Sequence, residues 1–246
     1  MALLSSIFAW FGSIFGRPRQ ISEEEFKTQR RESLDSVTLS GACYVPMAGF
    51  ESTVHYRDKQ NLHHLGRYEW AVRVLSPLPN RNAVLDCACG VGYGSRKLAE
   101  IFERVEGIDI YDRAIEMATE RYSHPNIEWK CMDVAKLRDT FAGESFDAIV
   151  SMQTIESVDD DEKYLDDLVA LLKPGGVLLI DTPLRKTRID NPESPHHKRY
   201  YGLDEWLQML QSRFEILVFG SLPEAALLES CQMSSRGSIV HCTKGS

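Results

Sequence analysis

The sequence predicts a doubly wound α/β fold with a mostly parallel, seven-stranded sheet. From residue 82 onward, short apolar runs alternate with amphipathic helical patterns. The runs lie at 83–88, 105–110, 126–131, 146–151 and 176–181, and the helical patterns at about 94–103, 112–122 and 160–172. Alternation at this spacing is typical of βαβ units. Two later apolar runs, 214–220 and 238–244, are the candidates for the sixth and seventh strands.

The residues before the sheet divide into two predicted segments. Residues 1–16, MALLSSIFAWFGSIFG, place bulky apolar side chains at helical spacing opposite a Ser/Gly face, and Gly16 and Pro18 end the pattern. We interpret this segment as an amphipathic helix that attaches to a membrane surface, with docking onto a partner or onto its own domain as the alternative. Residues 17–80 are predicted to be a linker and a helical cap, with a helix at 61–75 that the prolines of 76–80 end. The α/β domain is then predicted to be residues 81–246.

Composition excludes several classes of protein. The 246-residue chain has a net charge of −8, which argues against a general nucleic-acid binder. No run reaches the ~20 apolar residues that span a bilayer. The six cysteines lack paired metal-ligand spacing, and Cys87 and Cys89 fall at the end of a predicted buried strand, so we expect no metal. Reduced thiols fit a cytoplasmic protein, peripheral on the inner face of the membrane if the N-terminal helix binds there.

A glycine-rich turn follows the first predicted strand. Asp86 lies near the end of that strand, and Gly90, Gly92 and Gly94 form a GxGxG pattern before the next helix. Glycines allow a ligand to approach the backbone, and the amides at a helix N-terminus favour a carboxylate. Ligands of parallel sheets bind beyond the carboxyl ends of the strands. The pattern therefore predicts a ligand-binding turn.

Further acidic residues occur at the ends of the next two strands. Asp109 closes the second strand and can accept hydrogen bonds from ribose hydroxyls, and Asp133 closes the third, after Met132. With LLKPGG at 171–176, this set resembles the class I S-adenosylmethionine-dependent methyltransferases over residues 82–182. The resemblance implies a Rossmann-like fold and S-adenosylmethionine as cofactor.

The resemblance also implies roles for individual residues. Asp86 would orient the methionine amino group, Gly90 and Gly92 would line the methionine backbone, and Asp109 would hold the ribose. Ile110 would pack on the adenine, and Asp133, flanked by Met132 and Val134, would contact its amino group. Arg67, in the preceding helix, is a candidate for the donor carboxylate, and Gln153 follows the fourth strand beside the cofactor.

A nicotinamide dinucleotide fold is the rival interpretation. It would require GxGxxG, and Ser95 occupies the third glycine position of that pattern. If the aspartates were only helix caps and turn residues, they would have no reason to lie at three strand ends together.

The acceptor side is predicted from the loops after the fourth and fifth strands. A hydroxyl acceptor must lose its proton, which requires a base. The candidates are His196 and His197 in the long polar segment 183–206, His64 in the helix before the sheet, and Glu156 after the fourth strand. Ser157 stands where the family usually has histidine. The five basic residues of 183–206 suit a phosphate or another anion, or are a solvated charged loop.

A narrower resemblance covers NPESPHHKRYYGLDEWLQMLQSRFEI at 191–216 and HHLGRYEWA at 63–71, with YVP at 44–46. These motifs are similar to a bacterial subgroup of methyltransferases that act with glycosyltransferases, although Tyr200 replaces a common acidic residue. The resemblance implies methylation of a sugar hydroxyl in a surface polysaccharide or its lipid-linked or nucleotide-linked precursor. The alternatives are a small-molecule methyltransferase of the quinone or lipid type, and an assembly subunit that binds S-adenosylmethionine without turnover.

Overall fold

The computed structural model describes residues 58–194, 197–221 and 237–245. All of them belong to one compact unit, residues 43–246. The predicted amphipathic helix at 1–16 and the YVP motif at 44–46 lie outside the described residues. The compact unit takes in the helix that we assigned to a cap, so the boundary at residue 81 stays a prediction. Among the described helices, none is both long and apolar enough to cross a bilayer.

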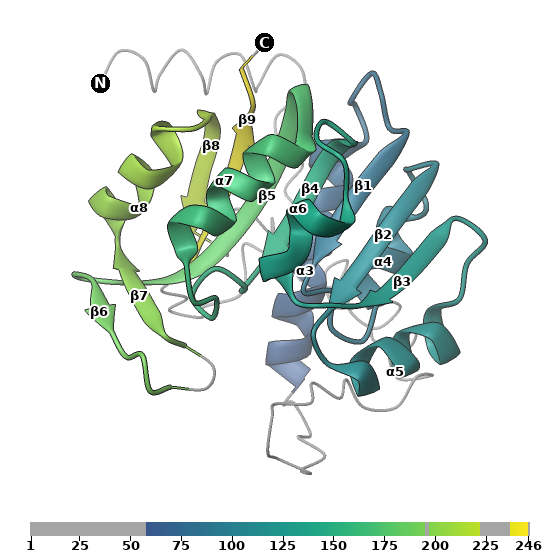
Figure 1. The fold of residues 1–246 in the computed structure, drawn as a ribbon, viewed down its shortest axis with the longest axis horizontal. Helices are drawn as coiled ribbons and strands as arrows, with labels where there is room; N and C mark the ends of the chain where they lie inside the picture. Colours follow the sequence, from purple (N-terminus) through teal and green to yellow (C-terminus); the bar gives the residue numbers. More distant parts are fainter. Residues whose placement is uncertain (1–57, 195–196, 222–236, 246) are drawn as a thin grey trace, which may run out of the picture. The chain divides into compact units, whose positions relative to one another are not determined.

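The sheet confirms the predicted doubly wound fold (Figure 1). Its parallel half consists of β1 (Ala83–Cys87), β2 (Arg104–Asp109), β3 (Ile127–Cys131), β4 (Phe146–Met152) and β5 (Leu172–Arg185), in the order β3-β2-β1-β4-β5. On the far side of β5, β9 (Gly237–Thr243) and then β8 (Glu215–Ser221) pair antiparallel. The order reverses between β1 and β4, which is the switch point where ligands of such sheets bind.

Helices connect the strands along the whole sheet. They are α3 (Asp58–Leu75), α4 (Tyr93–Leu98), α5 (Asp112–Tyr122), α6 (Leu137–Thr140), α7 (Asp161–Leu171) and α8 (Leu203–Gln211), with the 3-10 helix η1 (Val134–Lys136) before α6. Helix α4 is shorter than the predicted 94–103, because the chain leaves the helix at Ala99.

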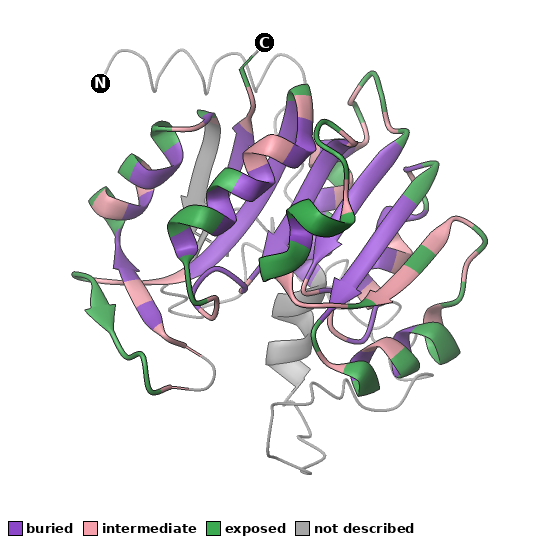
Figure 2. Cartoon of the chain, viewed as in Figure 1, coloured by how far each residue is buried: buried purple, intermediate pink, exposed green. Residues whose placement is uncertain are grey.

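Two apolar cores lie on opposite faces of the sheet. Neighbouring strand residues point to opposite faces, so Leu85 joins a core with α7 and α8, whereas Val84 joins a core with α3 and α4. The central strands are therefore buried on both sides, and the helices are buried only toward the sheet (Figure 2). This explains why the central strands β1 and β4 are mostly apolar, whereas the edge strand β3 is only partly buried and carries Glu128 and Lys130.

The segment between β5 and α8 differs from our prediction of a loop. It forms two further short strands, β6 (Ile189–Asp190) and β7 (Arg199–Gly202). They pair with each other antiparallel, and β7 pairs parallel with Leu184 and Arg185 at the end of β5. Residues 189–190 and 199–202 are too short to show the apolar alternation that identifies a strand, so the sequence pattern could not predict β6 and β7.

Candidate functional site

The glycine turn lies at the carboxyl end of β1, as predicted. Gly90 has φ +56 and Gly92 has φ +90, conformations that favour glycine, and α4 begins at the next residue, Tyr93. No described residue has an atom within 4 Å of the position that a Cβ on Gly90 would occupy, apart from its chain neighbours. The backbone at Gly90 therefore faces open space, where a ligand can approach it.

Asp109 ties the turn to the end of β2. Its Oδ2 accepts a hydrogen bond from the Gly90 amide and its Oδ1 accepts one from the Tyr111 amide, both at 2.9 Å. Burial raises the pKa of this carboxyl, and the two amides oppose that shift. The same carboxylate thus fixes the backbone of the turn and lies at the strand end where the family resemblance predicts the ribose.

Asp86 lies beneath the turn and is fully buried. Its two carboxylate oxygens accept hydrogen bonds from the Tyr68 hydroxyl at 2.8 Å and the Ser95 hydroxyl at 2.6 Å. Burial raises its pKa to about 7, against the lowering effect of those two donors. Asp86 is therefore positioned to brace the turn through Tyr68 and Ser95, and its predicted contact with the methionine amino group stays a prediction.

The remaining donor-site candidates gather at the ends of β2 and β3. Ile110 is 56% exposed, unusual for a large apolar side chain, and follows Asp109 directly. The Met132 amide donates to the Asp109 carbonyl, which holds the two strand ends together. One oxygen of Asp133 accepts from the Ala135 amide and caps η1, in which Val134 is the first residue. An exposed apolar surface between two aspartates suits an adenosine.

Asp109→Ala is expected to weaken the binding of S-adenosylhomocysteine about ten-fold or more. Hydrogen bonds to a charged group are worth about 1.5–3 kcal/mol, and this carboxylate anchors the turn. Titration calorimetry measures the affinity. The control is Asp112→Asn, which changes an exposed carboxylate bonded to the neighbouring Arg113 amide. An Asp109→Ala chain that binds as well as the control would contradict the assignment.

A second group of buried polar residues lies at the ends of β4 and β5. Asp181 on β5 accepts from Arg67 Nε at 2.7 Å and from the Gln153 amide at 2.7 Å. Both Arg67 and Asp181 are buried. Glu156 is fully buried, and its Oε2 accepts from the Thr182 hydroxyl at 3.1 Å. The structure thus brings together three predicted residues, Arg67, Gln153 and Glu156, around an aspartate that the sequence analysis did not single out.

The predicted histidines are described unequally. His196 lies outside the described residues, and the side chain of His64 on α3 does also. His197 is half-buried, its amide donates to the Ser194 hydroxyl, and its ring lies 5.4 Å from that of Tyr200. The base role of each histidine stays a prediction.

Most of the predicted basic cluster is neutralised within the protein. Arg188 pairs with Asp190 and Glu205, Lys198 pairs with Asp159, and Arg199 pairs with Asp161. Arg185 and Lys186 have no carboxylate partner among the described residues. The Arg185 guanidinium lies 4.1 Å from the centre of the half-buried Tyr200 ring. The cationic surface available to an anion is therefore smaller than the sequence predicted.

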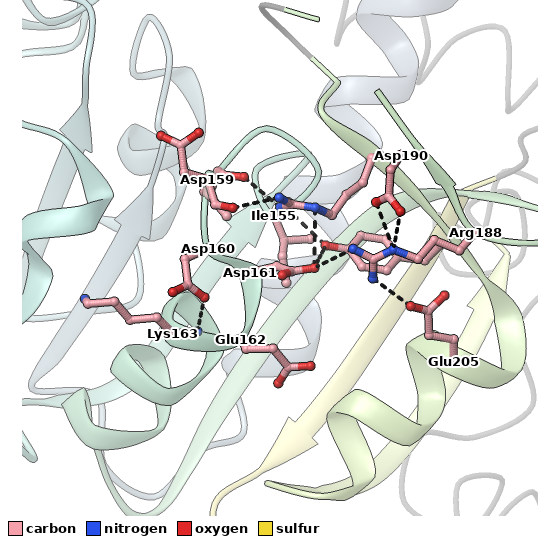
Figure 3. Close-up of polar contacts among 12 residues, drawn as sticks. Ile155, Asp159, Asp160, Asp161, Glu162, Lys163, Arg188, Asp190 and Glu205 are labelled. Carbon is pink, nitrogen blue, oxygen red and sulfur yellow. Dashed lines mark hydrogen bonds and ion pairs between the residues drawn. The ribbon is translucent and has the colours of Figure 1, made fainter. Parts of the chain in front are cut away.

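Asp161, in the first turn of α7, holds the β6–β7 segment to the sheet (Figure 3). Its Oδ2 accepts from the Tyr201 hydroxyl at 2.9 Å and pairs with Arg199 at 3.5 Å and Arg188 at 3.7 Å. Arg199 also donates to the carbonyls of Val158 and Asp159 at the preceding turn. This one buried carboxylate joins the segment after β5 to the segment after β4.

Asp161→Asn is expected to loosen the β6–β7 segment. The amide cannot balance the two guanidinium groups, and breaking a buried charge pair by changing one partner is strongly destabilising. Limited trypsin digestion measures the opening, and we expect cleavage after Arg185, Lys186 or Arg188 to be several times faster than in the native chain. Asp159→Asn removes an exposed ion pair of little energetic value and is the control. Equal cleavage rates in the two variants would contradict this role.

Sequence comparison finds methyltransferases among the proteins that this chain resembles. A family model described as a methyltransferase domain matches residues 85–180. A Mycolicibacterium smegmatis protein with the name "Probable S-adenosylmethionine-dependent methyltransferase" is 34% identical over 137 residues, 54% of this chain and 52% of that protein. A ubiquinone biosynthesis O-methyltransferase of Coxiella burnetii is 35% identical over 101 residues, 40% of this chain and 42% of that protein. The chain thus spans about half the length of the curated relatives it matches.

Solved structures show the same fold at low sequence identity. The N-methyltransferase NodS of Bradyrhizobium japonicum, in complex with S-adenosylhomocysteine, has a TM-score of 0.59 and 18% identity over 80% of this chain and 94% of NodS. The [4+2]-cyclase SpnF has a TM-score of 0.61 and 17% identity over 87% of this chain and 93% of SpnF. The fold is therefore the Rossmann-like fold of S-adenosylmethionine-dependent methyltransferases. The likeness to a cyclase shows that the reaction must be argued from the site.

The sequence pattern did not indicate the residues that hydrogen-bond to Asp86 and Arg67 and hold them in place. Tyr68, Ser95 and Asp181 bond to Asp86 or Arg67 across long separations in the chain. No spacing rule connects residues 67 and 181. Only Ser95 could be noticed in the sequence, because it stands where a dinucleotide fold has glycine. Its hydroxyl explains why serine is present there, since it donates to Asp86.

Proposed function

We propose that this chain transfers the methyl group of S-adenosylmethionine to an acceptor hydroxyl. The observation that supports the proposal best is the bond between Asp109 and the Gly90 amide, which ties the carboxylate expected to bind the ribose to an open glycine backbone. Exposed Ile110 supplies an apolar surface for the adenine. The bound donor supplies an already activated methyl group, so the protein mainly positions the two reactants.

The acceptor that we favour is a sugar hydroxyl of a bacterial surface polysaccharide or its precursor. The support is the resemblance of residues 63–71 and 191–216 to methyltransferases of that kind, together with Arg185 and Lys186 near the end of β5. A guanidinium without a carboxylate partner suits a phosphate of a nucleotide-linked or lipid-linked precursor. Association with glycosyltransferases of the pathway is part of this proposal.

A quinone or other small-molecule acceptor is the second candidate. The observation that favours it is the Coxiella burnetii relative, which is named for ubiquinone biosynthesis. A subunit that binds the donor without turnover is the third candidate. The intact Asp86, Gly90 and Asp109 speak against a decayed donor site, but a subunit that only binds the donor would keep them too, so methyl transfer itself has to be measured.

The proposal is tested with S-adenosylmethionine labelled in its methyl group. The purified chain is incubated with nucleotide sugars, with lipid-extracted glycan precursors and with a short-chain catechol, and labelled products are counted for each class. Product from a sugar-bearing fraction supports the favoured acceptor, and product from the catechol alone replaces it with the second candidate. Donor binding by calorimetry without product from any class supports the non-catalytic candidate.

Arg185→Gln is expected to raise the KM of a nucleotide-sugar acceptor about ten-fold, since one charge-assisted hydrogen bond to phosphate is lost. Initial rates at varied acceptor concentration measure the effect. A phosphate-free glycoside acceptor is the internal control, and its KM is expected to stay within two-fold. An equal rise for both acceptors would show that Arg185 acts on the local structure and not on the phosphate.

The N-terminal segment adds a proposal about location. Residues 1–16 would bind a membrane surface through their apolar face, with Arg17 and Arg19 near the headgroups. Flotation of the full chain with anionic liposomes tests this, and a chain without residues 1–16 is the comparison. Equal flotation of both would favour docking onto protein.

A further inference from the structure

Glu156 lies between the two segments that are expected to form the acceptor side. It follows β4 at the carboxyl edge of the sheet, and its side chain meets Thr182 at the end of β5. Its carbonyl accepts hydrogen bonds from the Lys198 and Arg199 amides, which lie at the start of β7. Backbone and side chain together fix this glutamate in one position.

One oxygen of this carboxyl has no partner among the described residues. Oε2 is bonded to the Thr182 hydroxyl, but the fully buried Oε1 accepts no hydrogen bond from any described residue. A buried polar atom without a partner costs about 1–3 kcal/mol, so such atoms are rare and need a reason. Three other buried acids of this edge, Asp86, Asp109 and Asp181, use both of their oxygens.

We propose that Oε1 of Glu156 is the atom that binds the acceptor hydroxyl and takes its proton. This inference rests on the proposed methyl transfer and extends it to the acceptor. The acceptor oxygen forms its bond to the methyl carbon while the carbon–sulfur bond breaks, and that electron pair stays on sulfur. The hydroxyl proton moves to Oε1, so a carboxylate and a sulfonium cation become a neutral acid and a neutral thioether.

The surroundings of Glu156 suit this role. Burial raises its pKa to about 8, helped by the nearby Asp181 and opposed by the Thr182 hydroxyl and Arg67. A base with a pKa near the working pH is the most effective, because it combines availability with proton affinity. The Thr182 hydroxyl and the Lys198 and Arg199 amides hold Glu156 in place. Oε1 is then the side-chain oxygen that is left to bind a ligand.

Carbon-13 NMR of the full chain labelled at the glutamate carboxyls tests the contact directly. The signal that disappears in Glu156→Gln identifies the residue, and Thr182→Val gives a second assignment because it moves the same signal. The probes, added with saturating S-adenosylhomocysteine, are methyl α-glucopyranoside and catechol. Each has its fully O-methylated counterpart as control. We expect at least one hydroxyl probe, and neither methylated counterpart, to shift the Glu156 signal.

Kinetics supply the second readout. On any acceptor that the native chain methylates, Glu156→Gln is expected to lower kcat at least 100-fold, within the range typical of a general base. The affinity for S-adenosylhomocysteine is expected to stay within three-fold. Glu106→Gln, which changes a buried glutamate paired with Arg104 and Lys130 on β2, is the matched control and keeps the response to the probes.

The outcomes are distinct. A Glu156 signal that ignores both hydroxyl probes, or a Glu156→Gln chain that keeps full kcat, overturns the inference. A shifted signal without methylated product from the native chain supports the hydroxyl contact and counts against the proposed function. Product formation with an unchanged Glu156→Gln rate supports the proposed function and overturns the role of Glu156.

Discussion

Gly94→Ala is expected to weaken donor binding about a hundred-fold and to lower the free energy of unfolding by about 2–6 kcal/mol. A Cβ on Gly94 would lie 2.1 Å from Cζ of Tyr68, in the buried core between α3 and α4. The ring cannot simply rotate away, because its hydroxyl donates to Asp86. The expected cost combines overpacking, about 1–3 kcal/mol, with a buried carboxylate that loses a donor, about 1–3 kcal/mol.

The control variant changes a glycine far from the site. Gly175 has φ +73 with no atom within 4 Å of its Cβ position, so Gly175→Ala adds backbone strain without a clash. It is expected to cost about 1–2 kcal/mol and to leave donor affinity unchanged. Chemical denaturation and calorimetry with S-adenosylhomocysteine give both quantities. If Gly94→Ala binds within three-fold of the native chain, the turn does not depend on Tyr68.

The parallel half of the sheet could be predicted because its cause is local. Strands such as β4, buried on both faces, are mostly apolar, and the glycine turn after β1 has a composition that few other structures need. The five parallel strands therefore appear within a few residues of the predicted bounds, apart from β5, which extends to Arg185. That extension depends on pairing with β9 and β7 and not on the apolar run itself.

The placement of the donor-side candidates could be predicted, and that of the acceptor-side candidates only in part. Asp109 and Gly90 follow strand ends, and topology alone brings parallel strand ends together. The contact of Glu156 with Thr182 and the β7 backbone depends on how residues 183–202 return over the sheet, and that return is fixed by Asp161 with Arg188 and Arg199. Charge composition indicated an anion site there, whereas the folded chain uses most of those charges on itself.

The second large effect concerns the pH dependence of stability. Glu156→Gln is expected to become progressively more stable than the native chain as the pH rises from about 5 to 8. In the native fold, burial raises the pKa of Glu156 to about 8, whereas its ordinary value is 4.5. Between these values the folded chain holds a proton that the unfolded chain has released, so the free energy of unfolding of the native chain falls as the pH rises. Glutamine has no proton to release.

The expected slope is up to about 1.4 kcal/mol per pH unit in the difference between the two chains. Below pH 4.5 and above about pH 8 the difference is constant, because the two states of Glu156 then hold equal numbers of protons. Asp86, with a pKa raised to about 7, acts in the same direction but is present in both chains and cancels.

Urea denaturation from pH 5 to 9 measures the curve. Gly175→Ala changes no titratable group and gives a flat difference as control. A flat curve for Glu156→Gln as well would mean that Glu156 is ionised in the folded chain and that a cation or donor reaches Oε1.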